Sequence, residues 1–105
     1  MASYKIIFYV PESHVEQVKE AVFLAGAGQQ GYYENCCWQV LGVGQFRPLV
    51  GSKPFIGTHD DFEQLAEYRV EVLCDEQYLT AAIHALKAAH PYEEPAVDVI
   101  LRHFD

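Results

Sequence analysis

The sequence predicts an α+β domain in which a four-stranded antiparallel sheet carries two helices on one face. Two observations support this class. Segments with strand-like and helix-like apolar spacing follow one another in the order strand, helix, strand, strand, helix, strand. The chain also has 105 residues with no internal linker or low-complexity segment. We therefore expect residues 1–105 to form a single domain.

The first strand and helix have clear patterns. Tyr4–Val10 is rich in β-branched and aromatic residues, as strands are, and Pro11 ends it. Ser13 and Glu16 have the spacing of a capping box, which predicts Ser13 as the N-cap of a helix. The helix's apolar stripe consists of Val15, Val18, Val22 and Ala25. The glycines that follow the stripe are typical of a helix end.

The middle of the chain is less regular. Cys36–Leu41 is predicted as the second strand, and the next three residues, Gly42–Gly44, as a bulge or turn before a short continuation at Gln45–Arg47. Pro48–Asp61 is rich in Gly, Pro, Ser, Thr and Asp, which predicts a long loop with Phe55 and Ile56 as a local anchor. Loops of that length in small domains tend to be functional or mobile.

The second half repeats the order of elements. Glu67–Leu73 alternates between apolar and charged residues, which predicts a half-buried strand. Asp75 can cap the next helix, and Ala96–Leu101 is the closing strand. The apolar stripe of this helix consists of Leu79, Ile83, Leu86 and His90. Two such halves match a ferredoxin-like βαββαβ sandwich.

Composition excludes several classes. With 15 acidic and 7 basic residues the formal charge is −8, whereas nucleic-acid binders carry basic patches, so nucleic acid is not expected as a ligand. No apolar run approaches the roughly 18 residues of a membrane span, and the first residues lack the layout of a secretory signal. The odd number of cysteines, with Cys36 and Cys37 adjacent, indicates no disulfide framework. A cytoplasmic location is expected.

Aromatic residues point to self-association. Seven Tyr, six Phe and one Trp are more than one small core is expected to absorb. An apolar second sheet face would require a partner. We therefore expect a homo-oligomer packed sheet against sheet, with a trimer favoured.

The segment 89–96 is the richest in chemistry. Between two prolines it places an imidazole, a phenol and two carboxylates. Each proline fixes its own φ and pushes the preceding residue toward extended geometry, so the turn is stiff. The candidate ligand-binding side chains are His90, Tyr92, Glu93 and Glu94.

Two interpretations of this turn remain open. Imidazole and carboxylate suit a divalent ion such as Zn²⁺ or Cu²⁺, and His90, Glu93 and the thiol of Cys36 are the candidate metal ligands. Alternatively, the turn is a rigid corner between helix and strand, with His90 as a satisfied core residue on the helix's apolar stripe. Glu67, on the preceding strand, is a further ligand-binding candidate and is predicted to pair with His90.

Three stretches carry a family resemblance, namely Gly26–Cys36, Gly42–Pro48 and His90–Ala96. In order and spacing they resemble the insertion domain of the Nif-three-like (YqfO-type) proteins. The last stretch also resembles the end of CutA, a trimeric protein linked to divalent-cation tolerance. Both resemblances imply a PII/CutA-like variant of the ferredoxin-like fold. Tyr32 and Tyr33, in the first stretch, are second-tier ligand candidates beside Cys36.

The resemblance also limits what is expected. Full-length Nif-three-like proteins carry a dinuclear metal site on segments that flank the insertion, and those segments are not in this sequence. Their hydrolase-like chemistry is therefore not implied. The glycine-rich turn at 26–31 follows a helix rather than preceding one, so it does not resemble a phosphate loop. No nucleophile elbow, P-loop or HExxH motif is recognised.

The leading hypothesis is a small cytoplasmic oligomeric module that binds or senses a small ligand or a divalent metal. The ligand would lie at clefts between subunits, and the module would have no catalytic activity of its own. A structural module for protein interaction is the first alternative. A hydrolase whose site is shared between subunits is the second.

Overall fold

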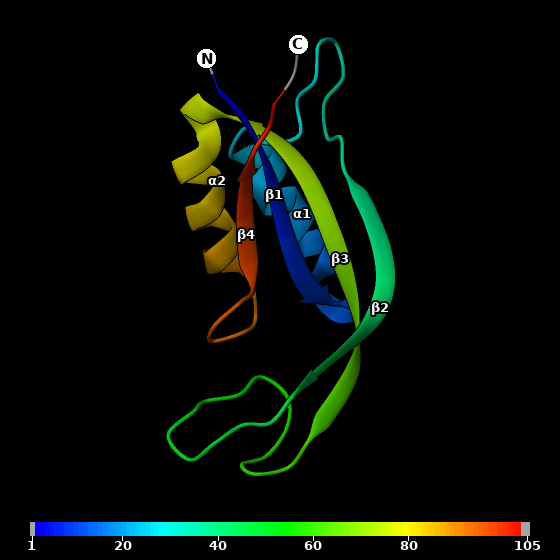
Figure 1. Cartoon of the computed structure of the whole chain (residues 1–105), viewed down its shortest axis with the longest axis vertical. Coiled ribbons are helices and arrows are strands. Elements are labelled where there is room, and N and C mark those ends of the chain that lie inside the picture. Colours follow the sequence, from blue (N-terminus) through cyan, green and yellow to red (C-terminus); the bar gives the residue numbers. More distant parts are fainter. Residues whose placement is uncertain (1, 104–105) are drawn as a thin grey trace.

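The structure, a computed structural model, describes residues 2–103. Within this range one sheet has the strand order β2-β3-β1-β4, and every neighbouring pair is antiparallel. Both helices lie on the same side of the sheet (Figure 1). The elements are β1 (Ser3–Pro11), the 3₁₀ turn η1 (Glu12–His14), α1 (Val15–Leu24), β2 (Trp38–Phe46), β3 (Glu63–Asp75), α2 (Glu76–Ala89) and β4 (Val97–Leu101). The predicted α+β sandwich is confirmed.

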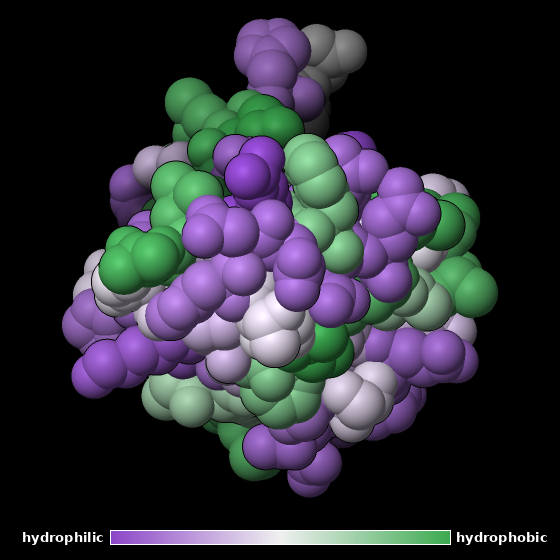
Figure 2. Space-filling view, turned by 90° about the horizontal axis from the view of Figure 1, so that it is seen from below, coloured by the Kyte–Doolittle hydropathy of each residue, from purple (hydrophilic) through white to green (hydrophobic). Residues whose placement is uncertain are grey.

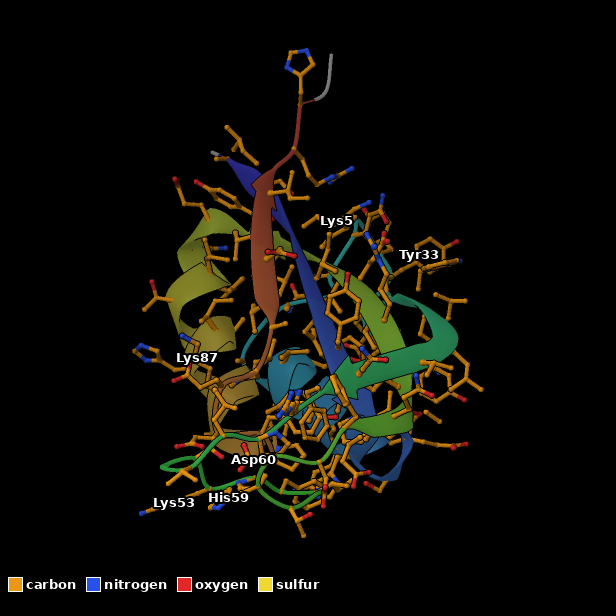
Figure 3. The ribbon with its side chains drawn as sticks, turned by 60° about the horizontal axis from the view of Figure 1, so that its bottom comes forward. Lys5, Tyr33, Lys53, His59, Asp60 and Lys87 are labelled. Atoms are coloured by element: carbon orange, nitrogen blue, oxygen red, sulfur yellow. The ribbon has the colours of Figure 1, made fainter. Side chains whose placement is uncertain are left out.

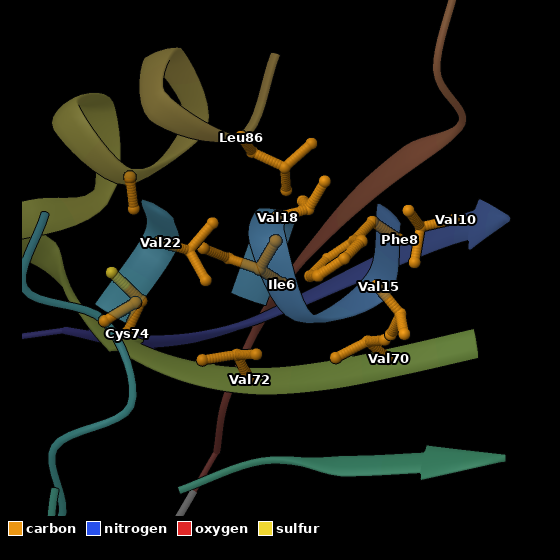
Figure 4. Packing of buried hydrophobic residues seen from close by; sticks show 12 residues of the cluster. Ile6, Phe8, Val10, Val15, Val18, Val22, Val70, Val72, Cys74 and Leu86 are labelled. Carbon is orange, nitrogen blue, oxygen red and sulfur yellow. The ribbon is translucent and has the colours of Figure 1, made fainter. Parts of the chain in front are cut away.

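The core lies between the two helices and the central strands (Figure 4). Alternate residues of a strand point to the same face, so Ile6 and Phe8 of β1 meet the helices together with Val70 of β3. They pack against Val18 of α1 and Leu86 of α2, and all five are completely buried. The apolar stripes predicted for both helices are therefore the stripes that face the sheet.

The predicted capping box at the start of α1 is wrong. Ser13 lies inside the 3₁₀ turn, and His14 occupies the N-cap position without a side-chain capping bond. The hydroxyl of Ser13 is instead hydrogen-bonded to Nδ1 of His14 at 2.8 Å. The extended Pro11 leads directly into this tight turn, and α1 therefore begins two residues after Ser13. At α2, Asp75 is the N-cap residue, as predicted, but its side chain makes no capping bond.

The predicted interruption of the second strand is also wrong. β2 begins at Trp38, after both adjacent cysteines, and pairs with β3 without a break as far as Phe46. Gly44 lies within this continuous pairing and does not interrupt it. A Cβ at this position would overlap the carboxyl group of Glu67, so the lack of a side chain leaves space for that group. β3 accordingly starts at Glu63, four residues earlier than predicted.

The long β2–β3 pairing gives the molecule its shape. It extends the molecule to 47 × 24 × 24 Å and carries residues 42–67, here called the arm, past the ends of the helices (Figure 1). Residues 47–62 form the irregular loop at the end of the arm, as predicted for most of this range. No helix in residues 2–103 is long and apolar enough to cross a membrane.

The sheet face opposite the helices is not the apolar surface that was expected. Its centre holds ion pairs, in which Glu71 contacts Lys5 at 3.0 Å and Arg69 at 3.3 Å. Arg69 also donates a hydrogen bond to the hydroxyl of Tyr9. Exposed apolar side chains flank this centre, and they are Trp38, Val40 and Ile100. The face therefore combines charged and apolar side chains. Its charged residues come from positions of β1 and β3 that alternate with the core residues of the same strands.

Candidate functional site

A pocket of about 400 Å³ lies where the arm loop meets the turn at 90–96 and the ends of β1, β2 and β3. Segments far apart in the sequence build it together. Its lining residues are Tyr9, Gln45, Phe46, Pro48, Ser52, Pro54, Phe55, Ile56, Glu67, Tyr92, Glu93, Glu94 and Ala96. Four of the seven predicted ligand-binding residues, Glu67, Tyr92, Glu93 and Glu94, thus meet at one place.

His90 fastens the turn to the sheet. It is 6% exposed and follows the last residue of α2. Its Nδ1 accepts a hydrogen bond from the backbone N–H of Tyr92 at 3.1 Å, so the proton of the neutral ring is on Nε2. Nε2 donates to the backbone carbonyl oxygen of Tyr9 at 2.7 Å. Both ring nitrogens are therefore engaged, as in the rigid-corner interpretation.

Burial is the main influence on the charge of this imidazole. Desolvation lowers the pKa of His90, while the Tyr9 carbonyl and the nearby Glu67 carboxylate act in the opposite direction. The nearby His14 adds to the lowering. The neutral form, which the two hydrogen bonds require, is thereby favoured near neutral pH.

Glu67 pairs with Tyr92 rather than with His90. The hydroxyl of Tyr92 donates to Oε2 of Glu67 at 2.5 Å, and the ring of Tyr92 lies 4.8 Å from the ring of His90. Burial, followed by this carboxylate, raises the pKa of Tyr92, so the phenol stays protonated and acts as a donor. The predicted Glu67–His90 pair is replaced by a chain of contacts from His90 through Tyr92 to Glu67.

Two contacts attach the arm loop to other parts of the chain that the structure describes. The backbone N–H of Lys53 donates to Oε1 of Glu93 at 2.8 Å, which links the loop to the turn. Phe55 meets the ring of His14 edge-on, with 5.1 Å between the ring centroids, and is the predicted anchor. Figure 3 shows Lys53 on this loop, together with His59 and Asp60. Glu93 and Phe55, which make these contacts, both line the pocket.

The remaining predicted residues lie elsewhere. Tyr32, Tyr33 and Cys36 belong to the connection between α1 and β2, and Figure 3 places Tyr33 far from the arm loop. Tyr32 and Tyr33 are largely exposed, and the structure does not bring them to the pocket. Cys36 is partly exposed and Cys37 exposed, and both precede the strand that was predicted to hold them.

The predicted metal ligands are not assembled within one chain. Cys36 lies in a different part of the molecule from His90 and Glu93, and the ring nitrogens of His90 are engaged. In the part of the chain that the structure describes, no three His, Cys, Asp or Glu residues are grouped so as to hold a metal ion. The donor set does not fit a resident metal in the single subunit.

Sequence reasoning missed much of the pocket wall. Phe46, Pro48 and Pro54 reach it because β2 continues to the arm loop and the loop folds back onto the turn. The length and composition of residues 48–61 did mark the loop as functional or mobile. Nothing in that signal specified which of its side chains line a cavity.

Comparison with known proteins gives this geometry a family context. No family model matches the chain. A protein of Mycobacterium leprae named "GTP cyclohydrolase 1 type 2 homolog" is 48% identical over 95 residues, which are 90% of this chain and 25% of that protein. A Bacillus subtilis protein of the same name is 42% identical over 95 residues, 90% of this chain and 26% of the relative. The chain therefore spans about a quarter of the length of these curated relatives.

A solved structure places the same segment in three dimensions. The Bacillus cereus protein related to NIF3 matches with a TM-score of 0.81 and 34% identity, over 96% of this chain and 26% of that one. The chain is similar to one segment of this NIF3-related protein. The predicted Nif-three-like resemblance is thus confirmed.

The second resemblance concerns the fold alone. CutA from Xylella fastidiosa matches with a TM-score of 0.70 and 20% identity, over 98% of this chain and 86% of that one. This chain therefore has the CutA-like form of the ferredoxin-like fold, as predicted.

Proposed function

We propose that this chain is a small-ligand-binding module without catalytic activity of its own, and that its ligand occupies the pocket between the arm loop and the turn at 90–96. The observation that carries the proposal is the pocket itself. Its volume of about 400 Å³ falls in the range of small-molecule sites, roughly 300–1,000 Å³, and a mostly apolar wall holds a few polar groups, as in such sites.

The polar groups of the pocket are held in place before any ligand arrives. The backbone N–H of Tyr92 donates a hydrogen bond to His90, and the hydroxyl of Tyr92 donates one to an oxygen of Glu67. Glu93 is held by the backbone of Lys53. Ordering these side chains in advance reduces the entropy that binding would cost. Such an arrangement supports recognition of a specific ligand.

Catalysis has less support. The curated relatives are named for GTP, but this chain covers only a quarter of them. Among the described residues that line the pocket there is no Lys, Arg or His side chain to contact a triphosphate. The imidazole of His90, which contacts the lining residue Tyr92, has both nitrogens engaged. We do not propose a cyclohydrolase activity for this module.

We also propose that the module is a cytoplasmic homo-oligomer, with a trimer as the favoured form. The exposed Trp38, Val40 and Ile100 beside the ion-paired sheet centre support self-association. The free thiols of all three cysteines fit a reducing compartment. Multi-angle light scattering should give a multiple of the subunit mass. W38K should reduce the measured mass. Y33K, which changes an exposed aromatic residue in another segment, should leave it unchanged. A monomeric wild-type protein would contradict the assembly.

A pocket-filling variant tests the ligand site. Ala96 lines the pocket and is exposed, so A96W should fill it with little effect on the core. A81W places the same side chain on the exposed face of α2 and serves as the matched control. Protein NMR is run with a panel of aromatic amines, alcohols and carboxylates, and with Zn²⁺ in a separate titration. At least one of these probes should give saturable shifts around the pocket in wild type and A81W. The same shifts in A96W would place binding elsewhere.

A further inference from the structure

The charge of the pocket wall is one-sided. Glu67, Glu93 and Glu94 line it, and the described lining residues include no basic side chain. Carboxylates are ionised near neutral pH and then only accept hydrogen bonds. The whole chain has a formal charge of −8, so no long-range positive field offsets them. Anions are therefore disfavoured inside this pocket.

Two of the lining hydroxyl groups have already used their protons. Tyr92 donates to Glu67, and Ser52 donates to the backbone oxygen of Leu49. By contrast, the hydrogen bond from Tyr92 engages Oε2 of Glu67, and the bond from the backbone of Lys53 engages Oε1 of Glu93, so each carboxylate keeps a second oxygen as an acceptor. A ligand with donor groups, or with a positive charge, complements these oxygens.

Four aromatic residues contribute to the pocket wall. Phe46 and Tyr92 lie with their ring centroids 6.2 Å apart at an angle of 55°, and Tyr9 and Phe55 add two further rings. Aromatic faces attract cations as well as apolar groups. Figure 2 views the molecule from the arm-loop end, where hydrophobic and hydrophilic side chains are interspersed rather than separated. A ligand that is both apolar and charged matches such a surface.

The carboxyl group of Glu67 lies against the backbone at Gly44. It occupies the space that a Cβ of Gly44 would fill, while Tyr92 holds it from the other side. In contrast to a solvated surface carboxylate, this group is confined on a strand at the pocket wall. Confinement of a charge at a fixed place gives specificity for an opposite charge at a matching distance.

We propose that the pocket selects a small organic cation, a protonated amine or guanidinium attached to an apolar or aromatic body. The inference rests on the proposed function and adds the chemical class of the ligand. The cationic group would lie at the carboxylates of Glu67 and Glu93, and the apolar body would lie against Phe46 and Phe55. Nucleotides and other phosphate-bearing molecules are excluded by the same charges.

Three probes of similar size and different charge test the selection. They are phenethylammonium, 2-phenylethanol and 3-phenylpropanoate, each titrated into the full chain and followed by protein NMR. We expect phenethylammonium to bind about fivefold or more tightly than the alcohol, consistent with one partly screened ionic contact, and the carboxylate to give no saturable shift. Added salt should weaken the binding of the cation and leave the alcohol unaffected.

Variants locate the charge. E67Q keeps an acceptor for Tyr92 but removes the negative charge, so most of the cation's advantage over the alcohol should disappear. E76Q, on the exposed start of α2, removes one charge from the chain far from the pocket lining and should leave the advantage intact. If E67Q and E76Q behave alike, the assigned role of Glu67 is wrong.

The remaining outcomes separate this inference from the proposed function. Equal affinities for all three probes, abolished by A96W, would overturn the cation selection and leave the pocket as a binding site. Binding of none of the probes, of the wider panel or of Zn²⁺ at the pocket would overturn both proposals. Saturable binding of Zn²⁺ at Glu67 and Glu93, with no binding of phenethylammonium, would replace the organic cation with a metal ion.

Discussion

The packed half of the molecule and its arm are made from the same sheet but differ in what surrounds them. In the packed half, Ile6 and Phe8 of β1 are fully buried under α1 and α2. In the arm, Val43 is 77% and Phe62 67% exposed, and within residues 47–62 only Pro48 is buried. Burial of apolar area is the main source of stability. The packed half therefore holds the fold together, and the arm is free to shape a pocket.

The largest test of this division compares two phenylalanines. F8A removes a ring that is completely buried in the packed half, and we expect it to lower the free energy of unfolding by about 3–5 kcal/mol. F55A removes the half-exposed anchor of the arm loop and should cost no more than about 1 kcal/mol. Urea denaturation followed by circular dichroism measures both values. Equal losses would show that the arm loop is part of the stabilising core.

A pair of glycines on the arm gives the next test. A Cβ at Gly44 would overlap the carboxyl group of Glu67, whereas a Cβ at Gly42 has its nearest neighbour, the backbone oxygen of Glu67, at 3.9 Å. G44A should therefore displace Glu67 from Tyr92 and cost about 1 kcal/mol, while G42A stays within about 0.5 kcal/mol of wild type. NMR shifts of the Tyr92 ring should move in G44A alone. Unchanged Tyr92 shifts in G44A would mean that Glu67 is not held there.

Much of the packed half could be predicted because local patterns there agree with the fold. Val15, Val18 and Val22 follow the spacing of a helix, and the residues after Glu67 alternate as in a strand. Each spacing places one face of its element against the core. The burial of His90 at the start of the turn at 90–96 also followed from its place on the α2 stripe. In this half, sequence spacing and tertiary packing impose the same requirement.

The arm could not be predicted in the same way. Its glycines indicated a break because glycine usually weakens a strand, but Gly44 is there to accommodate a side chain 23 positions later in the sequence. The partner of Tyr92 depends likewise on the register of β2, β3 and β1, which no local pattern specifies. The pocket is a product of these long-range contacts, so only four of its lining residues were identified in advance, namely Glu67, Tyr92, Glu93 and Glu94.

The pH dependence of stability tests the corner that joins the two regions. Burial lowers the pKa of His90 below the 6.5 of a free imidazole, so between these values the unfolded chain binds more protons than the folded chain. The contribution of neutral His90 to the free energy of unfolding is fully present above pH 6.5. It is lost as the pH falls toward the pKa of His90 in the folded chain. We expect a lower free energy of unfolding at about pH 5.5 than at about pH 7.5. The difference should shrink in H90Q.

H84Q is the matched control for this experiment. His84 is exposed on α2, so its replacement should leave the pH dependence of wild type in place. The carboxylates are the same in both variants, so the comparison of H90Q with H84Q isolates the contribution of the imidazole. A pH dependence that persists unchanged in H90Q would show that His90 does not carry it, and that the corner is held by other contacts.

The smallest expected effect concerns the point where the chain leaves the packed sheet for α1. Had Ser13 been the helix cap, as the sequence pattern suggests, S13A would cost about 1 kcal/mol. Because its hydroxyl contacts only the ring of His14 at an exposed site, the cost in the observed arrangement should be below about 0.5 kcal/mol. S52A is the matching variant in the arm, since the hydroxyl of Ser52 donates a hydrogen bond to a loop carbonyl there. Urea denaturation of S13A and S52A therefore compares the loss of one local hydrogen bond in each region. A loss near 1 kcal/mol in S13A would restore the capping box and move the start of α1 toward Ser13.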